Sequence, residues 1–234
     1  MSAIRSFNLY HFPATRSARV KWMLHECVGD GFSAAPLNLY AGEQYAPDYR
    51  AKNPNHNVPL LEIEFEDGRS LAMIESGAMI AWLADAFPEK GLAPPPGASA
   101  ARADYLQMLH FGASPMDMML WQIRVQEHLL PAAERDGATA ARYRAKFAEE
   151  VEPQLAARLQ RGGFICGEAF TAADCVIGHN VTWARAYAMC TDEIFSAYLS
   201  RLAKRPAFRA AFADARDFSP EPPRREGRKS PFNG

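Results

Sequence analysis

The chain has few cysteines and no long apolar runs. Its 234 residues include four cysteines, too few for a disulfide-stapled scaffold, and no two of them have the C-x-x-C spacing of a redox dithiol or a zinc knuckle. No apolar run reaches the ~18 residues that span a bilayer, and the first ten residues lack the apolar core of a signal peptide. These absences favour a reducing, cytoplasmic compartment and no membrane anchor.

The chain also has no excess of positive or negative charge. Lys and Arg number 26 against 27 Asp and Glu, for a formal net charge of −1, so no overall basic field exists to hold a nucleic-acid backbone. The six histidines are scattered without metal-ligand spacing, and we predict no metal site. With 48% apolar residues, the chain is typical of a globular protein of one large or two small domains.

The first 88 residues alternate strand patterns with helical ones. A strand is predicted at residues 7–10, and apolar residues at helical spacing predict a helix over 18–27. Further strands are predicted at 34–40, 60–63 and 70–74, with Pro36 indicating a sheet edge. A helix over 76–87 completes the order β-α-β, a connecting segment, β-β and α, which indicates a mixed sheet covered by helices.

A change of composition at residues 89–98, EKGLAPPPGA, predicts a linker after a first domain of residues 1–88. Residues 99–215 have helical patterns alone and are predicted to form an all-helical second domain. Its expected helices cover 99–128, bent or broken at Pro115, then 139–160, a third that starts with a capping box at Thr171, and finally 192–202 and 206–215. Residues 216–234 are predicted to be an irregular tail.

Three short segments hold the residues suited to chemistry. The first is NPNHNVPLL at 53–61, in which Pro59 opens a strand because proline cannot donate to a sheet ladder. A cis bond between Val58 and Pro59 would present the Val58 N–H and C=O groups to an extended peptide ligand. The alternative is an ordinary trans proline, which base rates favour because only about 5–6% of X-Pro bonds are cis.

The second segment is IESGA at 74–78, where a strand gives way to a helix. The helix N-terminus and Ser76 could bind a ligand carboxylate while Glu75 accepts from a ligand ammonium, which together would hold an amino-acid head group. The alternative is plain N-capping by Ser76.

The third segment is the turn after the first strand, YHFPATRSAR at 10–19. Thr15 and Ser17 supply hydroxyls and Arg16 a cation at the start of the first helix, and all three favour a docked anion. The alternative is that Thr15 or Ser17 caps the helix and Arg16 is solvated.

These segments, in this order, resemble the cytosolic glutathione S-transferase superfamily over about residues 6–215. The proline-rich linker, the helical second half and the F-T-A-A-D run at 170–174 belong to the same resemblance. The run T-R-S-A-R-V, followed by Trp22, is similar to bacterial and fungal members with an S-R-S-x-R-x-x-W pattern. The resemblance implies a thioredoxin-like N-terminal domain of order β-α-β-α-β-β-α, an all-α C-terminal domain, and a homodimer.

The resemblance also assigns roles for glutathione as co-substrate. Val58 would pair with the cysteinyl backbone beside a cis Pro59, and Glu75 and Ser76 would hold the γ-glutamyl end. Asn57 stands where the family often places Lys, Gln or Arg against the glycyl carboxylate, and His56 replaces a common glycine.

The thiolate-activating residue has three candidates at the opening turn. Thr15 best matches the position of the activating Ser, Ser17 takes that place if the turn is gapped differently, and Arg16 stands where cysteine-dependent branches carry Cys. Tyr10 ranks below these, because it lies within the strand.

The expected activity is attack of the activated thiolate on an apolar electrophile, as in transfer of alkyl or aryl groups to glutathione in detoxification. Alternatives are a glutathione-dependent peroxidase or reductase, an isomerase, and a non-catalytic binding or scaffold protein of the same fold. The electrophile is expected between the domains, although a methionine stripe at helical spacing is equally typical of core. The candidate wall residues are His11, Phe12, Met108, Phe111, Met116, Met119 and Trp121.

Overall fold

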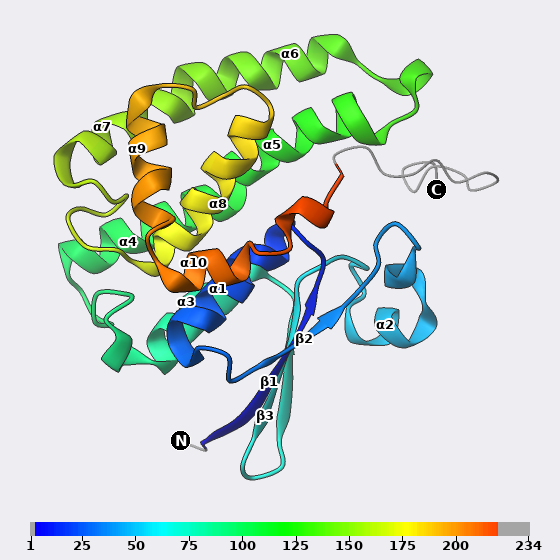
Figure 1. Ribbon diagram of the computed structural model, residues 1–234, viewed down its shortest axis with the longest axis vertical. Helices are drawn as coiled ribbons and strands as arrows, with labels where there is room; N and C mark the ends of the chain where they lie inside the picture. Colours follow the sequence, from blue (N-terminus) through cyan, green and yellow to red (C-terminus); the bar gives the residue numbers. More distant parts are fainter. Residues whose placement is uncertain (1–2, 220–234) are drawn as a thin grey trace.

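The computed structural model describes residues 3–219, and its N-terminal part is built on one four-stranded sheet (Figure 1). The strands are β1 (Ile4–His11), β2 (Ser33–Pro36), β3 (Leu60–Phe65) and β4 (Ser70–Met73), in the order β2-β1-β3-β4. β1 pairs with β2 in parallel, and the other two pairs are antiparallel. The predicted mixed sheet is therefore confirmed, and so is the edge position of the strand that contains Pro36.

Alternation along the strands sends apolar side chains to both faces of the sheet. Phe7 and Leu9 of β1 enter the main core, which α1 (Arg16–Val28) and α3 (Ser76–Ala86) cover. On the other face, Leu60 and Tyr49 belong to a smaller apolar cluster, with Tyr49 supplied by α2 (Pro47–Lys52). The order β-α-β-α-β-β-α is confirmed, although β2 ends at Pro36 rather than at residue 40.

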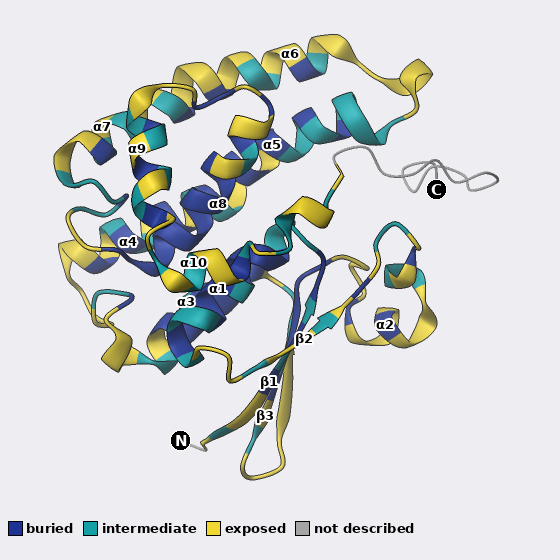
Figure 2. Ribbon diagram, in the orientation of Figure 1, coloured by how far each residue is buried: buried dark blue, intermediate teal, exposed yellow. Residues whose placement is uncertain are grey.

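The helix α1 joins the two halves of the molecule. It packs against α3 on one side and against α8 (Ala172–Ala186) and α10 (Pro206–Ala211) on the other. Trp22, fully buried, lies with its ring centroid 4.9 Å from that of Phe208 and 5.6 Å from that of Phe170. Figure 2 shows α1 and α8 buried along most of their length. The start of α1 is therefore held by packing from both halves.

The second half is helical, as predicted, but proline divides it further. The pattern over 99–128 forms α4 (Ala100–Phe111) and α5 (Asp117–Arg124), separated by a π-helical segment that contains Pro115 and followed by another at Val125–Leu129. Proline lacks the N–H of a regular helix, so the backbone widens there. The pattern over 139–160 likewise forms two helices, which are α6 (Gly137–Lys146) and α7 (Glu152–Gly162).

The remaining helices end the described chain. They are α9 (Glu193–Leu202) and α10, which stops at Ala211 and is followed by a 3-10 turn at Ala215–Asp217 rather than continuing to residue 215. Residues 220–234 of the predicted tail lie outside the described residues. The first two residues of the predicted linker at 89–98 belong to a 3-10 turn at Pro88–Lys90, and the domain boundary there stays a prediction.

The capping box at the start of α8 is present. Asp174, which is fully buried, accepts from the backbone N–H groups of Thr171 and Ile165, each at 2.9 Å, and from the Tyr198 hydroxyl at 2.8 Å. This carboxylate thereby fixes the N-terminus of α8 to the loop before it and to α9.

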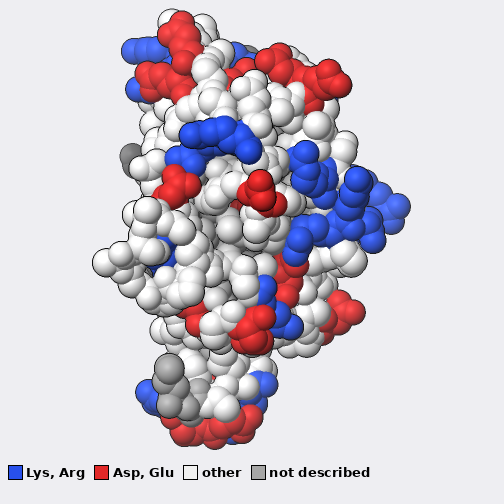
Figure 3. Space-filling model, turned by 90° about the vertical axis from the view of Figure 1, so that its left-hand side faces the viewer, with Lys and Arg blue, Asp and Glu red and all other residues white. Residues whose placement is uncertain are grey.

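The surface carries both signs of charge. Figure 3 shows Lys and Arg interspersed with Asp and Glu over one side of the molecule, with basic side chains gathered near one edge. Within the described residues, no helix has the length and apolar character needed to cross a membrane.

Candidate functional site at the start of the first helix

Thr15 is the N-cap of α1, so this helix begins two residues earlier than predicted. Its Oγ1 accepts from the Ser17 N–H at 3.4 Å and donates to the Phe12 carbonyl at 2.8 Å. Ala14, directly before it, has φ of 53°, in the left-handed region that favours glycine. The turn therefore holds a half-buried threonine hydroxyl at the positive end of the helix.

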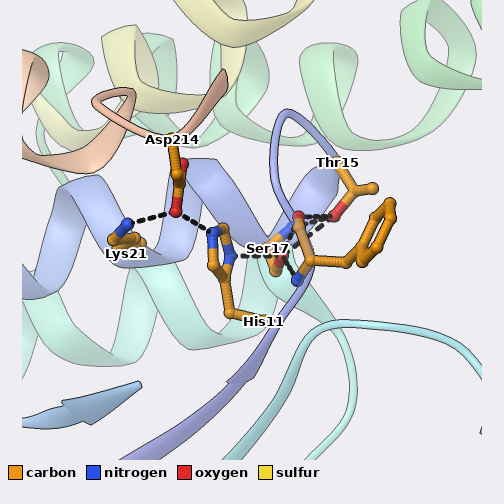
Figure 4. Close-up of polar contacts among 6 residues, drawn as sticks. His11, Thr15, Ser17, Lys21 and Asp214 are labelled. Carbon is orange, nitrogen blue, oxygen red and sulfur yellow. Dashed lines mark hydrogen bonds and ion pairs between the residues drawn. The ribbon is translucent and has the colours of Figure 1, made fainter. Parts of the chain in front are cut away.

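Ser17, the alternative candidate, is fully buried. Its Oγ lies 2.8 Å from Thr15 Oγ1 and 2.7 Å from His11 Nδ1, and it accepts from the Phe12 N–H at 3.1 Å (Figure 4). Of the two hydroxyls in this turn, Thr15 is therefore the one with surface to offer a ligand. Direct contact of Ser17 with a bound thiol is contradicted by this burial.

Arg16 is paired within the protein. Its Nε forms an ion pair with Asp117, and its guanidinium carbon lies 5.1 Å from the ring centroid of Trp121 and 5.4 Å from that of Trp183. Asp117 also accepts from Arg19 Nη1 at 2.9 Å. Burial opposes ionisation of Asp117, but the two guanidinium groups hold its pKa below the ordinary value. Arg16 is therefore not solvated as the alternative interpretation holds: it shares one carboxylate with Arg19, so the two guanidinium groups keep a net positive charge, and the role of Arg16 toward an anion at the turn stays a prediction.

The Val58–Pro59 bond is cis, as the ligand-binding interpretation requires. Both residues are buried directly before β3. Asn57 is exposed, and its carbonyl accepts from the Tyr49 hydroxyl at 2.5 Å and from Asn53 Nδ2 at 2.8 Å. His56 has φ of 41°, a value that accounts for the glycine common at this place in the family.

Glu75, not Ser76, is the N-cap of α3, so the alternative interpretation of plain N-capping by Ser76 is wrong. Ser76 is buried and its Oγ accepts from Arg19 Nε at 3.1 Å and from Arg19 Nη2 at 2.7 Å. Because two donors occupy the lone pairs of Ser76 Oγ, its own proton is available for an acceptor outside. Glu75 is exposed beside it. A hydroxyl donor, a buried cation and a carboxylate thus meet at the start of α3.

The predicted wall of the electrophile site is only partly accessible. Met108 and Met116 have 0% exposed surface and Met119 has 3%, and all three are part of the main core. The apolar packing between α4, α5 and α8 takes up these side chains, so their assignment to the wall is wrong. Phe111 and Trp121 are half-buried and keep surface for a ligand.

His11 and Phe12 are buried as well. The two ring nitrogens of His11 hydrogen bond to Ser17 and Asp214, and Phe12 packs edge-on against Tyr40 with ring centroids 4.8 Å apart. Both residues therefore support the turn from within, which corrects their assignment as wall residues.

Comparison with known proteins gives the family. The model of the glutathione S-transferase N-terminal domain matches residues 9–91, and that of the C-terminal domain matches residues 137–214. The chain belongs to the glutathione S-transferase superfamily. The first match contains the turn at Thr15, the cis peptide bond at Pro59 and the start of α3.

Comparison with individual proteins supports the same family assignment. The chain is 31% identical to glutathione S-transferase 3 of Zea mays, over 71% of this chain and 72% of the relative. It is 28% identical to a probable maleylacetoacetate isomerase 2 of Drosophila melanogaster, over 82% of each. A glutathione transferase family member from Pseudomonas fluorescens, solved with two glutathione bound, is similar in fold with a TM-score of 0.74, 23% identity, and coverage of 88% of this chain and 92% of that chain.

Sequence reasoning missed Asp117 and Asp214, and it used Arg19 only as part of a pattern. The S-R-S-x-R pattern marks Arg19 as a feature of the first helix. Asp117 lies 98 residues from Arg19, and Asp214 lies 203 residues from His11. No motif surrounds either carboxylate, so only the fold reveals them. Among residues 3–219, no group of His, Cys, Asp and Glu is arranged to hold a metal ion.

Proposed function

We propose that this protein binds glutathione along its N-terminal domain and activates the thiol at Thr15 for attack on an apolar electrophile. One observation carries the proposal: the Thr15 hydroxyl is half-buried at the N-terminus of α1. That end of the helix favours an anion, and residues 16–19 include no Asp or Glu to compete for it.

The rest of glutathione fits the other two segments. The γ-glutamyl carboxylate would accept from the Ser76 hydroxyl, behind which the buried Arg19 guanidinium supplies positive charge, and its ammonium would donate to Glu75. The cysteinyl backbone would pair with Val58 in the manner of strand addition. Asn57 is shorter than Lys, Gln or Arg and carries no charge, so we expect a weak contact with the glycyl carboxylate.

The energies are sufficient without a metal or a charged partner. A free thiol has a pKa of ~8.5, and lowering it to ~6.5 requires about 2.7 kcal/mol. A hydrogen bond to a charged group supplies ~1.5–3 kcal/mol, and a helix N-terminus adds ~0.3–1 kcal/mol. The Thr15 hydroxyl and the dipole of α1 together reach this range, so the mechanism does not require a contribution from Arg16.

The test compares two substitutions of one residue. Thr15→Val removes the hydroxyl at nearly constant shape, and we expect kcat/KM for glutathione conjugation to an aryl halide to fall ~10–100-fold. Thr15→Ser keeps the hydroxyl and should retain most of the activity. Equal activity in wild-type protein and Thr15→Val would overturn the proposed role, and failure of glutathione to bind the wild-type protein would overturn the function.

Isomerisation is the second candidate, and the Drosophila relative named a probable maleylacetoacetate isomerase favours it. The same thiolate would add to a conjugated double bond, rotation about the resulting single bond would follow, and expulsion of the thiolate would restore free glutathione. The two activities differ in stoichiometry. Conjugation consumes one glutathione for each product, whereas isomerisation leaves the glutathione concentration unchanged. Peroxide reduction would instead yield oxidised glutathione.

The homodimer is also part of the proposal. Leu71 on β4 and Met118 on α5 are each 42% exposed, the most exposed large apolar side chains of the described residues. Covering them in a self-association would remove apolar surface from water. Sedimentation should give twice the chain mass, and Leu71→Lys together with Met118→Lys should lower it to the monomer value. A cytoplasmic location stays a prediction.

A further inference from the structure

A hydrogen-bonded chain runs inward from Thr15 and ends at two groups to which the proposed function gives no role (Figure 4). From the Thr15 hydroxyl it passes to Ser17 Oγ at 2.8 Å and to His11 Nδ1 at 2.7 Å, and His11 Nε2 lies 3.0 Å from Asp214 Oδ2. Asp214, which follows α10, also accepts from Lys21 Nζ at 2.7 Å. One chain of contacts thus joins the surface of the turn to the second half of the protein.

The surroundings of His11 set its protonation state. The side chain is 6% exposed. Burial and the positive charge of Lys21 lower its pKa to about 4, although Asp214 acts in the opposite direction. The imidazole is therefore neutral at pH 7, with one nitrogen as donor and the other as acceptor. Because the Asp214 carboxylate only accepts, Nε2 carries the proton and Nδ1 accepts.

This tautomer fixes the direction of both hydroxyls. Ser17 donates its single proton to His11 Nδ1, so its oxygen serves as acceptor for the Phe12 N–H and for the Thr15 hydroxyl. The Thr15 proton is then shared between the Phe12 carbonyl and Ser17 Oγ, each 2.8 Å from Thr15 Oγ1, and the lone pair that the Ser17 N–H does not use can accept from a thiol. In the free protein the Ser17 proton points toward His11, and the Thr15 proton lies between Ser17 Oγ and the Phe12 carbonyl.

We propose, on the basis of the proposed function, that His11 receives the proton of the glutathione thiol through Thr15 and Ser17. The S–H bond breaks and its proton joins Thr15 Oγ1, while the Thr15 proton passes to Ser17 and the Ser17 proton to His11 Nδ1. The sulfur keeps the electron pair and becomes the thiolate. His11 becomes an imidazolium, and no group is oxidised or reduced.

The chain retains all of its hydrogen bonds after this transfer, with their direction reversed. His11 Nδ1 then donates to Ser17, Ser17 donates to Thr15, and Thr15 donates to the thiolate, while Nε2 still donates to Asp214. The charged groups facing His11 are Lys21 of α1 and Asp214 of the segment after α10. The low pKa that burial gives His11 favours release of the proton once the thiolate has reacted. A simple contact between Thr15 and sulfur would need neither His11 nor Asp214.

The first experiment follows His11 by nitrogen NMR of histidine-labelled protein, with His11→Asn used to assign its signals. In the free protein we expect the neutral ring with the proton on Nε2. Saturation with glutathione should raise the proton affinity of His11 ~1,000-fold over that in the S-methylglutathione complex, which carries its pKa from about 4 to near neutrality, because only glutathione supplies a thiol proton and a thiolate. Identical titration of His11 in the two complexes, or a free ring protonated on Nδ1, would overturn the proposal.

The second experiment measures the thiol pKa of bound glutathione from its thiolate absorbance. Ser17→Ala interrupts the chain, and His11→Asn keeps an acceptor near the Nδ1 position that cannot take up a proton at neutral pH. Each should raise the thiol pKa by about one, and the double variant should raise it no further, because both changes remove the same path. Additive effects would contradict a single path.

Failure of the relay can be distinguished from failure of the proposed function. If Thr15→Val raises the thiol pKa but His11→Asn and Asp214→Asn leave it at the wild-type value, the relay is wrong and activation by Thr15 stands. If wild-type protein shows no thiolate absorbance at neutral pH, the proposed function fails. Should Ser17→Ala not fold, the comparison of glutathione with S-methylglutathione on wild-type protein still decides the question.

Discussion

The N-termini of α1 and α8 share a threonine N-cap but differ in whether the protein supplies a carboxylate beside it. Each helix has a threonine at its N-cap, Thr15 for α1 and Thr171 for α8. At α8 a carboxylate of the protein, Asp174, fills the positive end of the helix and is fully buried. At α1 the first turn holds no acidic residue, and the threonine keeps surface.

This difference indicates that the N-terminus of α8 is satisfied by a carboxylate of the protein, whereas the N-terminus of α1 is expected to attract an anion from outside the protein. Both helix ends attract negative charge for the same reason, since their first N–H groups have no partners within the helix. The end that carries its own carboxylate contributes to stability. The end without one has a site that a bound anion can fill, which is the place proposed for the glutathione thiolate.

The largest expected effect comes from removing the carboxylate at the N-terminus of α8. Asp174→Ala leaves the N–H groups of Ile165 and Thr171 and the Tyr198 hydroxyl without their acceptor, and we expect a loss of ~3–5 kcal/mol in the free energy of unfolding. Urea denaturation measures it. Asp192→Ala, at the exposed N-cap of α9, is the matched control and should change stability by less than ~0.5 kcal/mol. Similar losses in both variants would contradict the special role of Asp174.

The next effect is acid sensitivity, which both helices share. His11 beside α1 and His179 on α8 have pKa values lowered from 6.5 to about 4, chiefly by burial. The unfolded chain binds these protons first, so the stabilisation from each neutral ring is complete above pH ~6.5 and is lost as the pH falls toward ~4. The full loss is on the order of 3 kcal/mol for each ring.

Urea denaturation across this pH range tests whether stability falls on acidification and whether both histidines contribute to the loss. His179→Gln should reduce the loss of stability on acidification, and His11→Asn should reduce it by a similar amount. A wild-type protein that gains stability between pH 6.5 and 4 relative to both variants would show that the sign is wrong.

A smaller effect is expected on glutathione binding at the N-terminus of α3, which also lacks an acidic residue in its first turn. Ser76→Ala removes the hydroxyl that Arg19 leaves free to donate, and we expect the dissociation constant for glutathione to rise ~10–100-fold, as measured by calorimetry. Ser70→Ala, on the exposed strand β4, is the control and should not alter binding. Cysteinylglycine lacks the γ-glutamyl group, so its affinity should be the same for wild-type protein and Ser76→Ala.

The smallest effect concerns the turn that presents Thr15. Ala14 has a φ of 53°, so Ala14→Gly relieves an unfavourable backbone conformation and should leave stability unchanged or raise it by up to ~1 kcal/mol. Ala103→Gly, at an exposed position inside α4, should lower stability by ~1 kcal/mol. Thermal unfolding separates the two, and a loss at both positions would mean that the turn is not strained.

Much of the fold could be predicted because its signals are local. Hydrophobic periodicity located the sheet and the helices, and the Thr171–Asp174 spacing located the capping box. Pro115 was correctly expected to interrupt a helix, although its result, a π-helical segment, depends on packing. The methionines at 108, 116 and 119 were misassigned because helical spacing alone cannot tell a core face from a pocket wall.

The site was predictable only where a motif surrounds it. The turn at Thr15, the Val58–Pro59 pair and Glu75–Ser76 each have a recognisable sequence. The choice between Thr15 and Ser17 needed burial, and the pairing of Arg16 with Asp117 needed a contact across 101 residues. Such contacts depend on how the two halves pack around α1, and sequence spacing does not show them.

The most direct test of the account is the thiol pKa of glutathione bound to the protein, read from thiolate absorbance as the pH is varied. We expect a value of ~6.5 in wild-type protein and Thr15→Ser, and a value near the ~8.5 of a free thiol in Thr15→Val. A wild-type value equal to that of free glutathione, with binding saturated, would contradict activation at the start of α1.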